Sequence, residues 1–114
     1  MRNSMTAVLE RNGITGPVFT TEPYEVAWAG EARWFIRTLE LPAPAQRVDV
    51  TVQVSPDGLH WTDADGEVRS IAEPGLTTWT SHEFGGWLRL RATVVAEDAA
   101  DVTIPALVYL ALKA

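Results

Sequence analysis

Apolar and polar residues alternate one by one along the longer stretches of this chain. Four valines alternate with polar residues in 48–54, and leucine, alanine and valine alternate with arginine and threonine in 88–94. A period of two places successive side chains on opposite faces of a β-strand. Less regular segments predict further strands at 6–10, 17–20, 24–29, 34–39, 67–72, 76–81 and 102–112.

Residue pairs that favour turns separate these segments, for example Asn12-Gly13, Pro74-Gly75 and Gly85-Gly86. No stretch has the 3.6-residue period of an amphipathic helix, and β-branched residues dominate the alternating segments. The pattern predicts an all-β fold, an antiparallel, jelly-roll-like β-sandwich of about eight strands, with residues 1–114 as a single domain.

The segment Ser55-Pro56-Asp57-Gly58 predicts one hairpin in detail. Proline fixes φ at the second position, and glycine accepts the left-handed conformation at the fourth, as in a type I turn with a bulge. Strand 47–54 is therefore expected to fold back into residues 59–63, with Trp61 on the returning strand.

Two motifs resemble a known family. Residues 55–61, SPDGLHW, are similar to the S-x-D-G-x-x-W hairpin of discoidin-type, galactose-binding-like β-sandwiches, and residues 84–91, FGGWLRLR, resemble the aromatic, hydrophobic and Arg-containing strand that follows there. Small jelly-roll proteins that decorate phage and other particles have the same kind of hairpin and a similar length. The resemblance implies a sandwich and leaves the ligand open.

Composition excludes several classes of partner and site. Acidic residues outnumber basic ones by 15 to 9, whereas a nucleic-acid surface needs clustered Lys and Arg. The first residues have no apolar run of signal-peptide length, and the apolar end is too short to cross a bilayer. We therefore expect no signal peptide, no membrane contact, and a location in the cytoplasm or on a virion or other particle. The absence of cysteine excludes disulfides and thiolate metal sites, and no cofactor is expected.

The residues for catalysis are sparse. His60 and His82 are the only histidines, and no phosphate-binding glycine loop is present. Ser55, Asp57 and His60 share one hairpin that lacks a strained nucleophile turn and an oxyanion hole, so we expect no enzyme and no metal site. The acidic segment 63–67 has half of a calcium-loop pattern, but it lacks the third acidic position and the distal glutamate of a full loop, so a solvated turn is the favoured interpretation.

Five tryptophans in 114 residues need an explanation. Trp34 and Trp61 are expected to pack in the core or against the hairpin. If Leu88 and Leu90 face inward, then Trp87, Arg89 and Arg91 share the outer face of their strand, either as a cation–π ladder or as a contact patch. Trp79 is a second candidate for binding.

The last strand, 102–112, is apolar on both faces. It is either central and covered on both sides, or its outward residues Leu107, Tyr109 and Ala111 form an apolar stripe for docking.

Together these features favour a structural or assembly module that binds a protein partner or itself, such as a phage-like capsid-decorating or tail-associated protein, and acts as a homo-oligomer. The predicted contact residues are Trp87, Arg89, Arg91, Trp79 and Tyr109. The alternative is a carbohydrate-binding module, in which exposed tryptophans stack on sugar rings.

Overall fold

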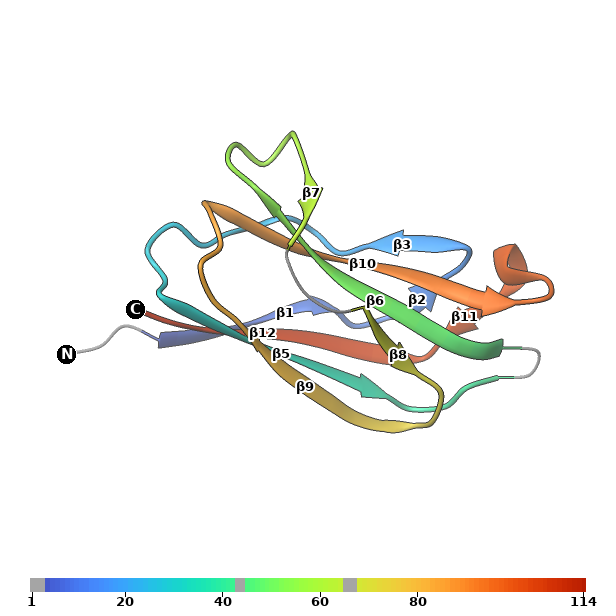
Figure 1. Cartoon of the computed structure of the whole chain (residues 1–114). Helices are drawn as coiled ribbons and strands as arrows, with labels where there is room; N and C mark the ends of the chain where they lie inside the picture. The colour runs from blue at the N-terminus through green and yellow to red at the C-terminus, as the bar shows by residue number, and fades with distance from the viewer. Residues whose placement is uncertain (1–3, 43–44, 65–67) are drawn as a thin grey trace.

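The computed structural model describes residues 4–42, 45–64 and 68–114, which form two antiparallel sheets packed as layers (Figure 1). The four-stranded sheet has the order β1 (Ser4–Glu10), β12 (Ala106–Lys113), β5 (Glu31–Thr38) and β9 (Gly75–Ser81). In the six-stranded sheet, β10 (Trp87–Ala96) and β6 (Ala45–Ser55) lie in the middle. There β3 (Val18–Thr20) and β4 (Tyr24–Glu25) flank β10, and β7 (Thr62–Asp63) and β8 (Arg69–Ile71) flank β6. A small third sheet pairs β2 (Ile14–Thr15) with β11 (Thr103–Ile104), and a 3₁₀ turn, η1 (Ala99–Asp101), precedes β11.

The order of the strands is that of a jelly roll. When β3 and β4, and likewise β7 and β8, are counted as single interrupted strands, and β2 and β11 of the small third sheet are set aside, eight main strands remain. Along these eight, the chain crosses between the two layers at every step except from β6 to β7. The first main strand pairs with the last, and the second with the seventh. This arrangement confirms the predicted all-β, antiparallel, jelly-roll-like sandwich.

The core lies between the two sheets and follows the predicted alternation. On β10, Leu88, Leu90, Ala92 and Val94 are buried, and on β12 the buried positions again alternate with half-buried ones. Trp34 on β5 is 0% exposed, which confirms its predicted place in the core. The largest fully buried side chains are Trp34, Ile14, Ile36, Leu88, Leu90, Ile104, Leu110, Leu112, Val26, Val48, Val50 and Val108.

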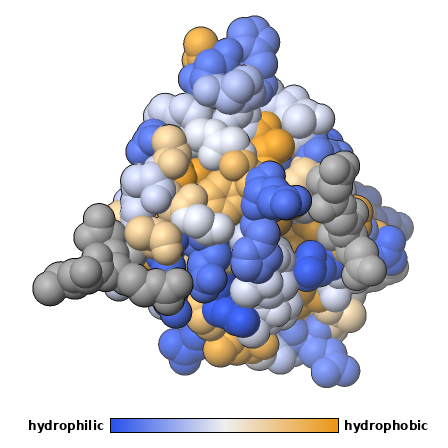
Figure 2. All heavy atoms as spheres, turned by 60° about the vertical axis from the view of Figure 1, so that its left-hand side comes forward, coloured by the Kyte–Doolittle hydropathy of each residue, from blue (hydrophilic) through white to orange (hydrophobic). Residues whose placement is uncertain are grey.

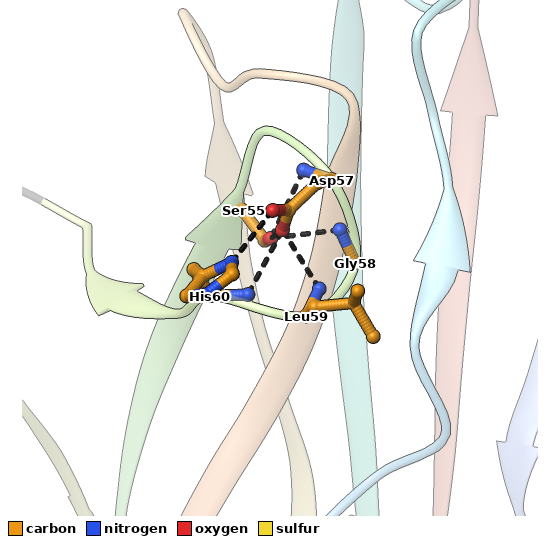
Figure 3. A network of polar contacts seen from close by, with 5 residues as sticks. All are labelled: Ser55, Asp57, Gly58, Leu59 and His60. Carbon is orange, nitrogen blue, oxygen red and sulfur yellow. Dashed lines mark hydrogen bonds and ion pairs between the residues drawn. The ribbon is translucent and has the colours of Figure 1, made fainter.

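The β6–β7 hairpin forms where it was predicted but has a wider turn (Figure 3). Gly58 has a φ of 79°, as expected for the left-handed position. The Asp57 carboxylate accepts hydrogen bonds from the backbone N–H of Leu59 at 2.8 Å and of His60 at 2.9 Å, which extends the turn. The returning strand therefore begins at Thr62, and the prediction that Trp61 lies on that strand was wrong by one residue.

Two other predicted strands differ in length. The segment predicted at 24–29 is a strand only over Tyr24–Glu25, because the Glu25 carboxylate accepts the N–H of Ala27 and a turn begins. The last predicted strand is split at Pro105, which has no N–H to donate to a neighbouring strand, into β11 and β12.

Part of one acidic segment cannot be compared with the structure. Residues 65–67 of the segment 63–67, considered above for calcium, lie outside the described residues, as does Glu67 of the predicted strand 67–72. In the described ranges, no helix is long and apolar enough to span a bilayer.

Candidate interaction surface

Trp87, Arg89 and Arg91 lie on the outer face of the six-stranded sheet, because Leu88 and Leu90 between them point into the core. Trp87 is half-buried against the β6–β7 turn: a Cβ atom on Gly58 would lie 3.1 Å from Cε2 of its ring. Arg91 is exposed. The orientation of these three residues is thus the one that the alternation of this strand predicts.

Arg89 is held by neighbouring strands. Its guanidinium carbon lies 4.3 Å from the centroid of the Trp61 ring, and its Nε donates to Gln53 Oε1 at 2.7 Å. The Gln53 amide in turn donates to Asp63 Oδ1 at 3.0 Å. Burial lowers the pKa of Arg89, and the charge of Arg91 lowers it further. This cation–π contact joins Arg89 to Trp61, which lies just before β7, and does not involve Trp87.

Trp79 lies inside the sandwich, away from the other predicted residues. It is 7% exposed, stacks on Trp34 with ring centroids 6.1 Å apart, and has the Arg69 guanidinium carbon 4.7 Å from its ring centroid. Trp79 also lines a groove of about 580 Å³ between β9 and the β7–β8 side of the other sheet. Its Nε1 is buried without a hydrogen-bond partner among the described residues.

Tyr109 lies on the outer face of the four-stranded sheet, where β12 is an inner strand. Cross-strand partners point to the same side of a sheet, so Val8 on β1, Tyr109 on β12 and Phe35 on β5 form one outward row. In the next row Leu107 lies beside Arg37, and Arg37 lies beside Leu76 of β9. Tyr109, Phe35 and Leu107 are half-buried, while Val8 and Leu76 are 39% and 63% exposed. We call these five apolar residues, Val8, Phe35, Leu76, Leu107 and Tyr109, the outer apolar face.

Two arginines of β5 share the outer side of the sheet with these residues, and one of them, Arg37, lies between Leu107 and Leu76. Arg33 and Arg37 on β5 are exposed on either side of Phe35, and Arg33 Nη1 donates to Thr78 Oγ1 at 3.1 Å. Sequence reasoning picked out Tyr109 and Leu107 but missed Phe35, Arg33 and Arg37. The signal was present, because these three residues alternate with the core residues of the same strand.

Apolar surface also occurs at the end of the molecule where both termini lie. Figure 2 brings this end forward and shows apolar residues gathered near its centre with hydrophilic residues around them.

The five predicted contact residues do not form one site. Three lie on one outer face, Tyr109 lies on the opposite outer face, and Trp79 lies between the sheets.

The Ser55, Asp57 and His60 side chains do come together, but as a turn and in the wrong order for a catalytic triad (Figure 3). Asp57 lies between the other two: its Oδ1 accepts from Ser55 Oγ at 3.0 Å, and its Oδ2 lies 2.6 Å from His60 Nδ1. Ser55 Oγ accepts the N–H of Gly58 at 2.8 Å. In a triad the histidine must contact the serine hydroxyl, so this network holds the hairpin.

The Asp57 carboxylate is strongly perturbed by its hydrogen bonds. The backbone N–H of His60 lowers its pKa most, and the His60 ring, the N–H of Leu59 and the Ser55 hydroxyl lower it further, to well below the usual range. Among residues 4–42, 45–64 and 68–114, no three His, Asp or Glu side chains are grouped closely enough to hold a metal ion.

Comparison of the sequence with protein families gives no match, and comparison with curated proteins gives none either. Solved structures with the same fold are found. The SPBc2 prophage-derived protein YomS is similar over 100% of this chain and 96% of its own, with a TM-score of 0.65 and 12% identity. The PBSX exported protein XepA has a TM-score of 0.66 and 10% identity over 95% of this chain, which spans only 36% of XepA.

A third similar structure is that of the Bacillus endospore appendages, described as disulfide-linked pili, with a TM-score of 0.58 and 8% identity over 99% of this chain and 84% of that one. At such low identities the likeness establishes the β-sandwich fold alone. It does not bear on the discoidin-type hairpin motif, which stays a resemblance in sequence.

Proposed function

We propose that this chain is a non-catalytic structural module that docks on the surface of a protein partner or particle, for example as a capsid-decorating or tail-associated protein of a phage-like system. The observation that carries the proposal is the outer apolar face. A central strand of the four-stranded sheet has aliphatic and aromatic side chains on the side away from the core. A contiguous apolar patch on a sheet face is typical of a surface that another protein covers.

The residues of this face also fit a protein interface in type. Tyr, Phe and Arg are enriched where proteins meet, whereas Lys, Glu and Asp are depleted there. Phe35 and Tyr109 lie side by side, with Arg33 and Arg37 bordering them. We therefore infer a partner surface that is apolar where it meets Phe35 and Tyr109 and has carboxylates opposite the two arginines.

The known structures with this fold support the proposal in a general way. YomS is described as prophage-derived, and the endospore appendages are pili, so the fold occurs elsewhere in a prophage-encoded protein and in a filament. The appendages are described as disulfide-linked, whereas this sequence contains no cysteine. Assembly through the outer apolar face would therefore be non-covalent. Self-association into a homo-oligomer is one form that it could take.

Density-gradient sedimentation tests the proposal. The chain is mixed with particles released from cells that encode it, and its position in the gradient is followed by immunoblot. The wild-type chain is expected in the particle fraction. The substitution Tyr109→Asp should increase the unbound fraction of the chain at the top of the gradient by at least about tenfold over the wild type. The reason is that a buried unpaired carboxylate costs a few kcal/mol at an interface.

Thr51→Asp is the matched control, since Thr51 is half-buried on the outer face of the other sheet and lies opposite Arg91. This variant should stay with the particles. A wild-type chain that remains entirely at the top of the gradient would overturn the proposal, as would equal effects of the two substitutions.

A carbohydrate-binding role remains the alternative, and it rests on the two tryptophans of the opposite face. In the structure Arg89 covers the ring of Trp61, and Trp87 lies against the Gly58 turn, so both rings are engaged within the chain. Quenching of tryptophan fluorescence by millimolar sugars, abolished by Trp87→Ala, would favour this alternative over assembly.

A further inference from the structure

The free edge of β9 differs from the other edges of the two sheets. β9 pairs with β5 in unbroken register over seven residues, from Gly75 to Ser81. The register of β1 shifts between Val8 and Glu10. The edges of the six-stranded sheet are interrupted, because β3, β4, β7 and β8 are each two or three residues long. Within the described residues, β9 is thus the one edge that is both long and regular.

This edge also lacks the features that usually prevent pairing. Natural sheets protect their edges with charged residues, prolines, bulges or very short strands. The sequence of β9, GLTTWTS, contains no charge and no proline, and its register has no bulge. A strand with these properties is a template for another strand, whose backbone would bond to its free N–H and C=O groups.

Space for the side chains of an added strand lies beside this edge. The groove of about 580 Å³ borders the last three residues of β9, Trp79 to Ser81, and Val52, Val54 and Leu88 of the opposite sheet line it. Trp79 of β9 lines this groove, and its buried Nε1 lacks a partner in the described chain. A buried donor left without an acceptor is costly, by about 1–3 kcal/mol, so an incoming acceptor would be stabilising.

We infer that the occupant of this edge is a second copy of the same chain, paired β9 to β9 in antiparallel orientation. A strand paired with itself about a twofold axis is antiparallel by symmetry, and both copies use the same surface. The chain as a whole has a net charge of −6 and therefore repels itself. A strand without any acidic residue is where two copies can approach closely.

The length of β9 sets the register. Centring the pair on Thr78, the middle residue of the strand, places Thr78 opposite its equivalent and Leu76 opposite Thr80. Thr77 then lies across from Trp79 of the second copy. Both face the sandwich interior, because Thr78 between them faces outward with Phe35. This register brings the Thr77 hydroxyl to the side of the strand on which the Trp79 indole lies.

Pairing of this kind would join the two four-stranded sheets into one continuous sheet. The outer apolar faces of the two copies would then lie side by side and offer a partner twice the area. The inference rests on the proposed assembly role and adds to it the way in which copies combine.

Sedimentation equilibrium of the purified chain tests the pairing. We expect a reversible dimer, and Thr78→Lys should raise its dissociation constant by about tenfold or more, because like charges would face each other across the twofold axis. Thr78→Glu should do the same. An equal mixture of the two variants should restore dimers that contain one copy of each.

Thr20→Lys is the matched control, because Thr20 is an exposed threonine on the short edge strand β3. It should leave the dimer unchanged, and circular dichroism should show all variants folded. A strictly monomeric wild-type chain, a dimer that tolerates Thr78→Lys, or a mixture that stays monomeric would each overturn the inference. A monomer that still sediments with particles would overturn the pairing of β9 and leave the proposed function in place. A dimer that never binds particles would support the pairing and overturn the proposed function.

Discussion

Gly58 is the residue where the turn of the β6–β7 hairpin and the packing of Trp87 meet. Its φ of 79° is strained for any residue with a Cβ, and a Cβ here would lie 3.1 Å from the Trp87 ring. We expect Gly58→Ala to destabilise the protein by about 1–2 kcal/mol, as for other non-glycine residues in this conformation. The added Cβ should displace the Trp87 ring and thereby change the tryptophan fluorescence emission. Urea unfolding measures the loss of stability.

Gly85→Ala provides the comparison for this substitution. Gly85 has no positive φ, and its Cβ would meet the nearest atom, Ser55 O, at an ordinary 3.5 Å. Equal destabilisation by the two substitutions would show that neither the left-handed conformation of Gly58 nor its contact with Trp87 determines the effect on stability.

Asp57 makes the stability of the hairpin depend on pH. Its pKa is lowered in the folded chain, so the unfolded chain binds more protons in acid. The contribution of Asp57 to the stability of the folded chain is fully present above the ordinary carboxyl pKa of about 3.9. It is lost as the pH falls toward the pKa of Asp57 in the folded chain. Urea unfolding of the wild type and Asp57→Asn should differ at pH 7 and converge at low pH. A difference that grows in acid would contradict the assigned hydrogen bonds.

At the scale of single elements, β12 has two unlike faces although its sequence is apolar throughout. Leu110 is 0% exposed in the core, while Leu107, three positions earlier, is half-buried on the outer apolar face. Leu110→Ala should cost about 2–5 kcal/mol, because it leaves a cavity in the core. Leu107→Ala should cost less than about 1 kcal/mol, because its surroundings are partly solvent.

The urea midpoints of these two variants measure the difference at constant m-value. Since both are leucine-to-alanine changes on one strand, their comparison is independent of residue type. A larger loss for Leu107→Ala would reverse the two faces of β12 and remove the basis of the proposed docking surface.

The main elements follow from local sequence, whereas their limits do not. The alternation in β6 and β10 was sufficient to find these strands and to orient Trp87, Arg89 and Arg91. The wider turn depends on the Asp57 carboxylate accepting two backbone N–H groups, and the early end of β4 depends on Glu25. In such places a single hydrogen bond from a side chain decides where a strand ends, and the alternation of apolar and polar residues does not predict that bond.

The whole molecule is held together by pairs that are far apart in sequence. The first strand pairs with the last, with Ser4 opposite Lys113, so the four-stranded sheet is complete only when both ends of the chain have met. Closing such long loops is costly in entropy and slows folding. We expect refolding in about milliseconds to seconds, as for other all-β domains. Stopped-flow tryptophan fluorescence measures this, and complete refolding in microseconds would be inconsistent with the topology.

The sequence by itself determined the class of fold and the sides of β6 and β10 that face the core, because a period of two is local and can be read residue by residue. It also identified the hairpin at Gly58 and the apolar character of the last strand. Only the tertiary structure decided that Tyr109, Phe35 and Val8 form one row, that Trp79 is enclosed between the sheets, and that β9 has a free edge. These features depend on which strands become neighbours, and neighbours are chosen by packing over the whole chain.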